Sequence, residues 1–161
     1  MAWVMYRNFK NGQLAGDDIH AGYPVDFGTG GNPIGLLLLV TGSAIDQADV
    51  TLQDVVAGAS DTEVTGTNYA RKAITSIVDG IVSTDNTAIT TAMADISYAQ
   101  SDSGFTTAKY AIMYKSNTAS IGSETTASCP VIASYTFASS IGNVAGALSL
   151  DFTASTLFTL A

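Results

Sequence analysis

Residues 34–40 read Ile-Gly-Leu-Leu-Leu-Leu-Val and carry no polar side chain. The segment is bordered by Gly30-Gly31-Asn32-Pro33 before it and by Thr41-Gly42-Ser43 after it, and both borders favour turns. It is much shorter than the roughly 20 apolar residues of a membrane-spanning helix, and it is short for a buried helix. A strand that is apolar on both faces belongs inside a sheet whose two sides are covered. The sequence therefore predicts that residues 34–40 form the central strand of the fold.

The rest of the chain predicts short strands separated by polar turns. Alternation of apolar and polar residues predicts strands at 72–78, 81–83, 88–98, 110–115, 131–137, 148–153 and 157–160. Strands at this spacing, without alternating helices, are typical of a mainly β, antiparallel sandwich of the jelly-roll-like or immunoglobulin-like kind. We therefore expect a single domain over residues 1–161, with an N-terminal arm and loop at 1–32 and the sandwich at 33–161.

Two short helices are expected beside the strands. Apolar residues in the segment 2–14 follow a helical stripe that ends at Asn11-Gly12, although an arm without fixed structure is the alternative. Residues 15–33 contain five glycines and two prolines, which predicts a long surface loop. A second helix is predicted at 51–57, because Thr51 can cap it, Asp54 lies at its third position and Gly58 follows its end.

Composition limits the kinds of partner. Six Lys and Arg residues stand against 14 Asp and Glu residues, and the net charge is −8. Nucleic-acid binding needs clustered cations, so we expect no nucleic-acid partner. Charged residues make up 12% of the chain, against about 25% in an average soluble domain. The exposed side chains are therefore expected to be small, neutral and weakly hydrated. Such a surface suits close packing in an assembly better than a dilute monomeric state.

The start of the chain lacks the basic and apolar regions of a signal peptide, and no segment predicts a membrane span. We expect synthesis in a cytoplasm and no membrane partner.

Residues that carry catalytic chemistry are scarce. His20, the single histidine, lies in the Gly-rich loop, and the chain has no Gly-x-Ser-x-Gly motif, which argues against a Ser-His-Asp site. One histidine and one cysteine, Cys129, cannot supply the ligands of a zinc site, and a single cysteine forms no intrachain disulfide. Gly28-Thr29-Gly30-Gly31 precedes a strand and lacks the Lys that follows in a phosphate-binding loop. We expect no enzyme activity, no metal and no cofactor, with His20 at the surface and Cys129 packed as a small apolar residue.

Two groups of residues are candidates for an interface with a partner. Arg71 and Lys72, next to Tyr69, form the one dense basic spot of the chain. They either protect a strand edge from strand addition or pair with carboxylates of a neighbouring molecule. The second group lies near the N-terminus and consists of Trp3, Tyr6, Arg7 and Phe9. Its aromatic side chains either cover the core or insert into a partner.

Several segments, taken in order, resemble a family of small β-rich structural proteins of tailed-bacteriophage particles. The matching segments are Tyr6-Arg7-Asn8-Phe9-Lys10, Pro33 to Ser43, Val50 to Val55, Thr67 to Lys72, Asp95 to Tyr98, Ala111 to Lys115, Pro130 to Phe137, Leu150-Asp151-Phe152 and Leu157-Phe158. The resemblance implies no catalytic residues. It implies a virion protein, which we expect to be a decoration or cement protein on the outer surface of the head.

On this interpretation the partners are the major capsid protein and further copies of the chain, with a trimer as the expected arrangement. One alternative is a structural protein of the tail, the minor tail or the head–tail connector. A lesser alternative is a β-sandwich that binds carbohydrate on a host surface through Tyr23, Tyr98 and Phe105, which lie near acidic residues.

Overall fold

The computed structural model describes residues 3–10, 32–57, 62–74, 81–82, 88–90, 94–151 and 158–159. The predicted Gly-rich loop, apart from its last two residues, lies outside these ranges, as do His20 and Tyr23. The strands are β1 (Val4–Met5), β2 (Ile34–Val40), β3 (Lys72–Ile74), β4 (Ile81–Val82), β5 (Ala88–Thr90), β6 (Ile96–Tyr98), β7 (Ala108–Lys115), β8 (Val131–Ile141), β9 (Leu148–Leu150) and β10 (Phe158–Thr159). The helices are α2 (Leu52–Ala57) and the 3-10 helix η1 (Thr126–Ser128), and residues 7–10 are also helical.

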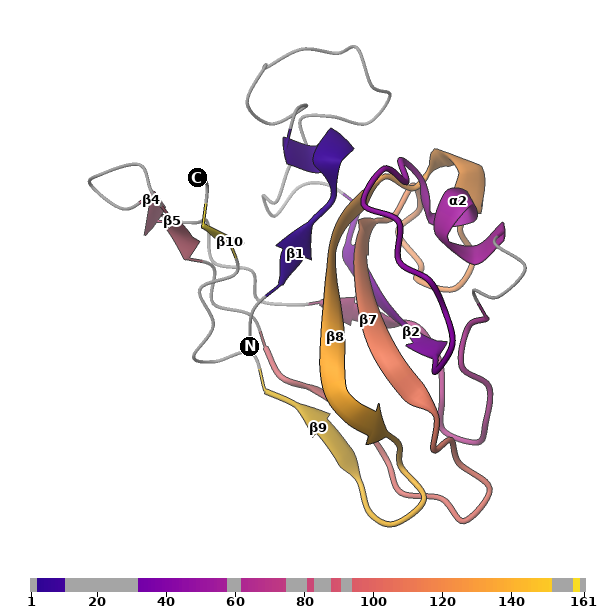
Figure 1. Ribbon diagram of the computed structural model, residues 1–161. Coiled ribbons are helices and arrows are strands. Elements are labelled where there is room, and N and C mark those ends of the chain that lie inside the picture. The colour runs from indigo at the N-terminus through magenta and orange to yellow at the C-terminus, as the bar shows by residue number, and fades with distance from the viewer. Residues whose placement is uncertain are drawn as a thin grey trace.

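The main sheet has five antiparallel strands in the order β1-β8-β7-β2-β3, and its three longest strands lie side by side in Figure 1. Strand β2 is an interior strand, and six of its seven residues are buried. A three-stranded sheet has the order β10-β5-β4, and a two-stranded sheet pairs β6 with β9. The prediction of a mainly β, antiparallel fold with 34–40 as an interior strand is confirmed, whereas the jelly-roll-like or immunoglobulin-like sandwich stays a prediction.

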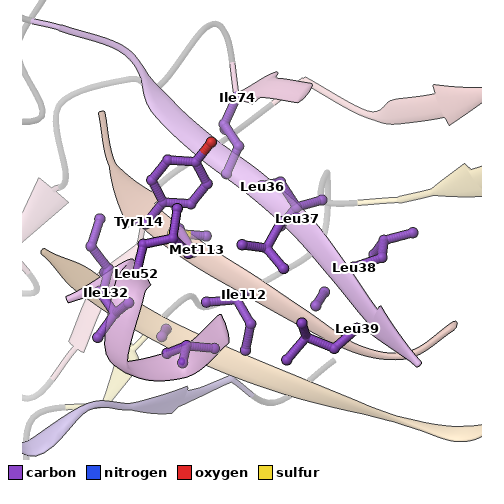
Figure 2. Close-up of a cluster of buried hydrophobic side chains, with 14 of the residues drawn as sticks. Leu36, Leu37, Leu38, Leu39, Leu52, Ile74, Ile112, Met113, Tyr114 and Ile132 are labelled. Atoms are coloured by element: carbon purple, nitrogen blue, oxygen red, sulfur yellow. The ribbon is translucent and has the colours of Figure 1, made fainter. Parts of the chain in front are cut away.

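One face of the main sheet is covered by the segment that leads into α2. Cross-strand pairing places Leu37, Ile112 and Ser134 on this face. The side chain of Gln47 donates a hydrogen bond to Ser134 Oγ at 3.1 Å, so the chain crosses the sheet here before α2 begins. Buried Leu52 of α2 joins the same cluster, as Figure 2 shows.

The other face is covered by the two-stranded sheet. Leu36 pairs with Lys72 of β3 and shares its face. The ammonium group of Lys72 lies 5.4 Å from the ring centroid of Tyr98 in β6, so this strand packs toward that face. Both faces of β2 are therefore dry, as its sequence requires.

A glycine near the start of the leucine-rich strand leaves room for an aromatic ring. Gly35 pairs with Tyr114 of β7, and a Cβ at Gly35 would overlap the Tyr114 ring. The ring is fully buried and lies over the glycine. Since an aromatic ring placed over a glycine restores the packing that the missing side chain would have given, the pair forms one packing unit.

The N-terminal helix begins later than predicted, and the prediction of a helix from residue 2 is wrong. Val4 and Met5 form β1 and pair with Ser134 and Ala133 at the edge of β8, and the amide of Tyr6 donates to Ile132 O. Helical residues begin at position 7. The edge of β8 satisfies the backbone hydrogen-bonding groups of this segment. A local sequence pattern cannot reveal this pairing, because the partner strand lies more than 120 residues away.

The helix predicted at 51–57 is confirmed, with its first residue one position later. Asp54 N donates to Thr51 Oγ1 at 3.3 Å and Thr51 N donates to Asp54 Oδ2 at 2.9 Å. This reciprocal pair is the capping box that the sequence predicts.

Two strand predictions need correction. The single strand predicted over 88–98 is divided, because β5 belongs to the three-stranded sheet and β6 to the two-stranded sheet. The strand predicted over 131–137 continues to Ile141. Its pairing with β7 slips there: Tyr110 pairs with Thr136 but Ala108 pairs with Ile141, so residues 137–140 lie opposite Lys109 alone.

Replacing Gly35 with Ala should destabilise the protein by about 1–3 kcal/mol, since the added methyl group displaces the Tyr114 ring from a packed core. Urea unfolding of the purified protein measures the change. The matched control is Gly146→Ala, where an added Cβ meets nothing within 4 Å. Equal effects at the two positions would contradict the packing unit described above.

Candidate functional site

A polar cluster at the β3 side of the main sheet is built around Arg71. Its guanidinium group binds Glu63 through both carboxylate oxygens, with Nη2–Oε2 at 2.7 Å and Nε–Oε1 at 3.0 Å. The remaining nitrogen, Nη1, lies 3.3 Å from Glu124 Oε2. The side chain of Glu124 is fully buried, and those of Arg71 and Glu63 are 16% and 26% exposed. One cation therefore joins two carboxylates in largely dry surroundings.

Two tyrosine hydroxyl groups complete the cluster. Tyr114 Oη donates to Glu124 Oε1 at 2.6 Å, and Tyr69 Oη donates to Glu63 Oε1 at 2.9 Å. Tyr69 Oη also accepts the amide of Leu38 at 3.0 Å. We call these five side chains, Glu63, Tyr69, Arg71, Tyr114 and Glu124, the arginine cluster. It ties the edge of β2 to β7 and to the polar loop 116–128.

The surroundings of the cluster shift the protonation of its members. Burial opposes ionisation of Glu124, but hydrogen bonds from Tyr114 and the Gly122 amide, together with the charge of Arg71, outweigh it and lower its pKa below 4.5. Burial raises the pKa of Tyr114, and the hydrogen bond to Glu124 raises it further. The hydrogen bond to Glu63 raises the pKa of Arg71. All three groups therefore hold fixed charge states at neutral pH, which is the behaviour of a structural cluster rather than of a proton-transfer site.

The structure places the predicted basic spot inside the chain. Arg71 pairs with this chain's own carboxylates, an arrangement that neither of the two sequence-based alternatives included. Lys72 lies over the ring of Tyr98, and Tyr69 is half-buried. The roles of these three residues as interface candidates stay predictions.

The N-terminal candidates are divided by burial. Trp3, Tyr6 and Phe9 are 8%, 0% and 2% exposed, and the Trp3 ring lies 5.7 Å from that of Tyr135. They therefore cover the core within the chain, as one of the two alternatives expected. Arg7, on the same segment, is exposed. Their contact with a partner stays a prediction.

A neutral hollow lies at the far end of β8. A cavity of about 200 Å³ is lined by Thr106, Ser140, Ile141, Gly142, Val144 and Ala145. Ser140 Oγ is 2.6 Å from Thr41 Oγ1, which also donates to Thr107 O at 3.2 Å. The lining offers hydroxyl groups and apolar surface without any charge, so it suits a small neutral side chain of a partner better than an ionic ligand.

The burial of their side chains bears on the remaining candidate residues. Tyr98 and Phe105 are 0% and 3% exposed and pack edge-to-face at 5.6 Å, so they do not form the exposed platform that the carbohydrate alternative requires. Cys129 is buried, as predicted. Within the described ranges, no three His, Cys, Asp or Glu side chains lie close enough together to hold a metal ion. No helix in the same part of the chain is long and apolar enough to span a membrane.

The sequence did not identify the two carboxylates that surround Arg71. Glu63 precedes it by eight residues and Glu124 follows it by 53, and no local sequence pattern relates either carboxylate to Arg71. Comparisons with known proteins add no further signal, because no family model, no curated protein and no solved structure matches the chain.

Replacing Arg71 with Met should destabilise the protein by about 3 kcal/mol, since the substitution leaves the buried carboxylate of Glu124 without its cation. Chemical unfolding measures the loss. Lys72→Met is the control, because it removes an adjacent cation that pairs with no carboxylate among the described residues. Adding Glu124→Gln to the Arg71→Met variant should restore part of the stability, and the absence of any restoration would contradict the assigned pairing.

The stability contributed by ionised Glu124 should be lost in acid. Its pKa in the folded protein lies below the value of 4.5 expected when unfolded, so the contribution is complete above pH 4.5 and disappears as the pH falls through the folded value. Unfolding free energies of the wild type and of Glu124→Gln, measured from pH 7 downward, should differ least at the acid end. A difference that is constant with pH would contradict this role.

Proposed function

We propose that this protein is a structural component of a bacteriophage particle: a decoration or cement protein that binds the outer surface of the head and bridges capsid subunits. Its role is mechanical rather than catalytic. It is made in the host cytoplasm and ends on the virion, and its partners are the major capsid protein and further copies of itself.

The resemblance to phage structural proteins supports this proposal through its place in the fold. The resembling segments 33–43, 111–115 and 130–137 contain most of β2, β7 and β8, the three long strands of the main sheet. The segment 67–72 carries Tyr69 and Arg71 of the arginine cluster. The matching pieces thus belong to one packed unit rather than to scattered turns.

The observation that carries the proposal is the neutral surface at the far end of β8. Its exposed residues are small and uncharged: Thr106, Thr107, Thr136, Ala138, Ser139 and Ser140. The charge beside them is that of half-buried Lys109, whose ammonium group donates to Ala138 O at 2.9 Å. Two of the exposed residues, Thr106 and Ser140, also line the hollow described above. In a chain of net charge −8, such a surface loses little hydration when a partner covers it, and it avoids charge repulsion between neighbouring copies.

The proposed mechanism is thermodynamic linkage. A protein that binds the assembled shell, but not its separated subunits, stabilises the shell by an amount that grows with its concentration relative to the dissociation constant. Copies grouped as trimers at local threefold axes would each touch more than one capsid subunit. The acidic charge of the chain disfavours the DNA side of the shell.

Quantitative mass spectrometry of purified particles separates this function from the tail or connector alternative. A decoration protein is present in hundreds of copies and is released with the head fraction, whereas a tail or connector protein is present in few copies. A low copy number in the tail fraction would contradict the proposal while leaving a structural role in place.

Ser139→Lys should weaken binding to heads at least about tenfold, because the ammonium group would lose hydration in a neutral contact. Since Ser139 is exposed, the unfolding free energy should change by less than about 0.5 kcal/mol. Co-sedimentation with heads that lack the protein measures binding. The control is Gln53→Lys on α2, which packs beside η1 near the opposite end of β8. Equal binding of both variants to heads would show that the neutral surface does not contact the head.

A further inference from the structure

The outer edge of the main sheet exposes an apolar side chain. Strand β1 is the outermost strand beyond β8, as Figure 1 shows. Val4 lies opposite Ser134 on the face that the segment before α2 crosses. It is 53% exposed, and among the described residues it is the one large apolar side chain with high exposure.

Two hydrogen bonds bring charged residues of opposite sign close together. The amide of Arg7 donates to Gln47 O at 2.9 Å, and Asn8 Nδ2 donates to Ala48 O at 3.1 Å. Residues 46–48 therefore lie directly beside residues 7 and 8. Arg7, Asp46 and Ala48 are all exposed. We call Val4, Arg7, Asp46 and Ala48 the edge patch.

The charges of the edge patch do not neutralise each other within the chain. The ion pairs among the described residues are those of Arg71 with Glu63 and Glu124. Asp46 Oδ1 accepts a hydrogen bond from the Ala48 amide at 2.8 Å, and this bond fixes the orientation of the carboxylate. Arg7 and Asp46 are a neighbouring cation and anion, and neither forms an ion pair with another described residue. They are therefore placed to pair with the opposite charges of another molecule.

We propose that the edge patch is a contact between two copies of this chain related by a twofold axis. Arg7 of each copy pairs with Asp46 of the other, and the two Val4 side chains pack between these pairs. A patch that carries both signs beside an exposed apolar side chain can be self-complementary, as a twofold interface requires. A partner surface of one sign would meet a like charge at Arg7 or at Asp46, which favours a second copy as the occupant.

This contact does not depend on the proposed role in a phage particle. Copies with a net charge of −8 repel one another unless cations lie at their contact, and the edge patch supplies one cation from each copy. The twofold contact is also compatible with trimers, because it would join copies that belong to neighbouring trimers.

Exchange of the charges tests the proposal on the purified full-length chain. Sedimentation velocity compares the wild type, Arg7→Asp, Asp46→Arg and an equimolar mixture of the two variants. The wild type should associate reversibly, and each variant alone should associate at least about tenfold more weakly because like charges then face each other. The mixture should regain association, since Asp at position 7 of one variant faces Arg at position 46 of the other.

Two further variants separate charge from local structure. Asp46→Asn keeps an oxygen acceptor for the Ala48 amide but removes the charge, and it should still weaken association. Asp102→Arg, an exposed charge reversal on another loop, should leave association unchanged. A wild type that stays monomeric at every concentration, or a mixture of folded variants that fails to regain association, would overturn the proposal. Loss of head binding by the variants of a monomeric wild type would instead assign the patch to a different protein.

Discussion

The burial of β2 on both faces is the constraint on which the rest of the structure depends. Four consecutive leucines leave the strand no side that tolerates water, so every backbone group along it must find a protein partner and each face must be covered. Strand β7 pairs along its whole length on one side. On the other side, β3 and the segment 62–64 divide the edge between them. The segment that leads into α2 covers one face of β2, and the two-stranded sheet covers the other.

The arginine cluster completes the edge where β3 and the segment 62–64 leave a gap. The amide of Leu38 finds its acceptor in the hydroxyl of Tyr69, which in turn is held by Glu63 and hence by Arg71. An unsatisfied amide in this position would carry a desolvation cost that one added hydrogen bond removes. The cluster therefore meets the same requirement as the core, which is that every backbone group along buried β2 must have a hydrogen-bond partner. Its buried charges pair with one another and hold Tyr69 in position.

The features that the sequence predicted are those set by neighbouring residues. The apolar run of β2, the capping box of α2 and the burial of Cys129 all depend on local pattern, and the structure confirms them. The features that it missed depend on distant partners. Val4 and Met5 form a strand because β8 offers an edge, and the alternating segment 88–98 is divided because its two ends pair in different sheets. The sequence did not predict the carboxylates around Arg71 for the same reason, because they belong to two loops far from each other in the sequence.

The slipped pairing at the end of β8 has a consequence for crowding. Residues 137–140 bulge away from a regular ladder, and Lys109 fixes the bulge by donating to Ala138 O at 2.9 Å. A flat, uncharged strand margin would offer a template on which further chains could add and grow into fibrils. The irregular backbone removes that template while keeping the small neutral side chains that a partner can cover. At this end of β8, the irregular backbone therefore disfavours amyloid-like addition of further strands.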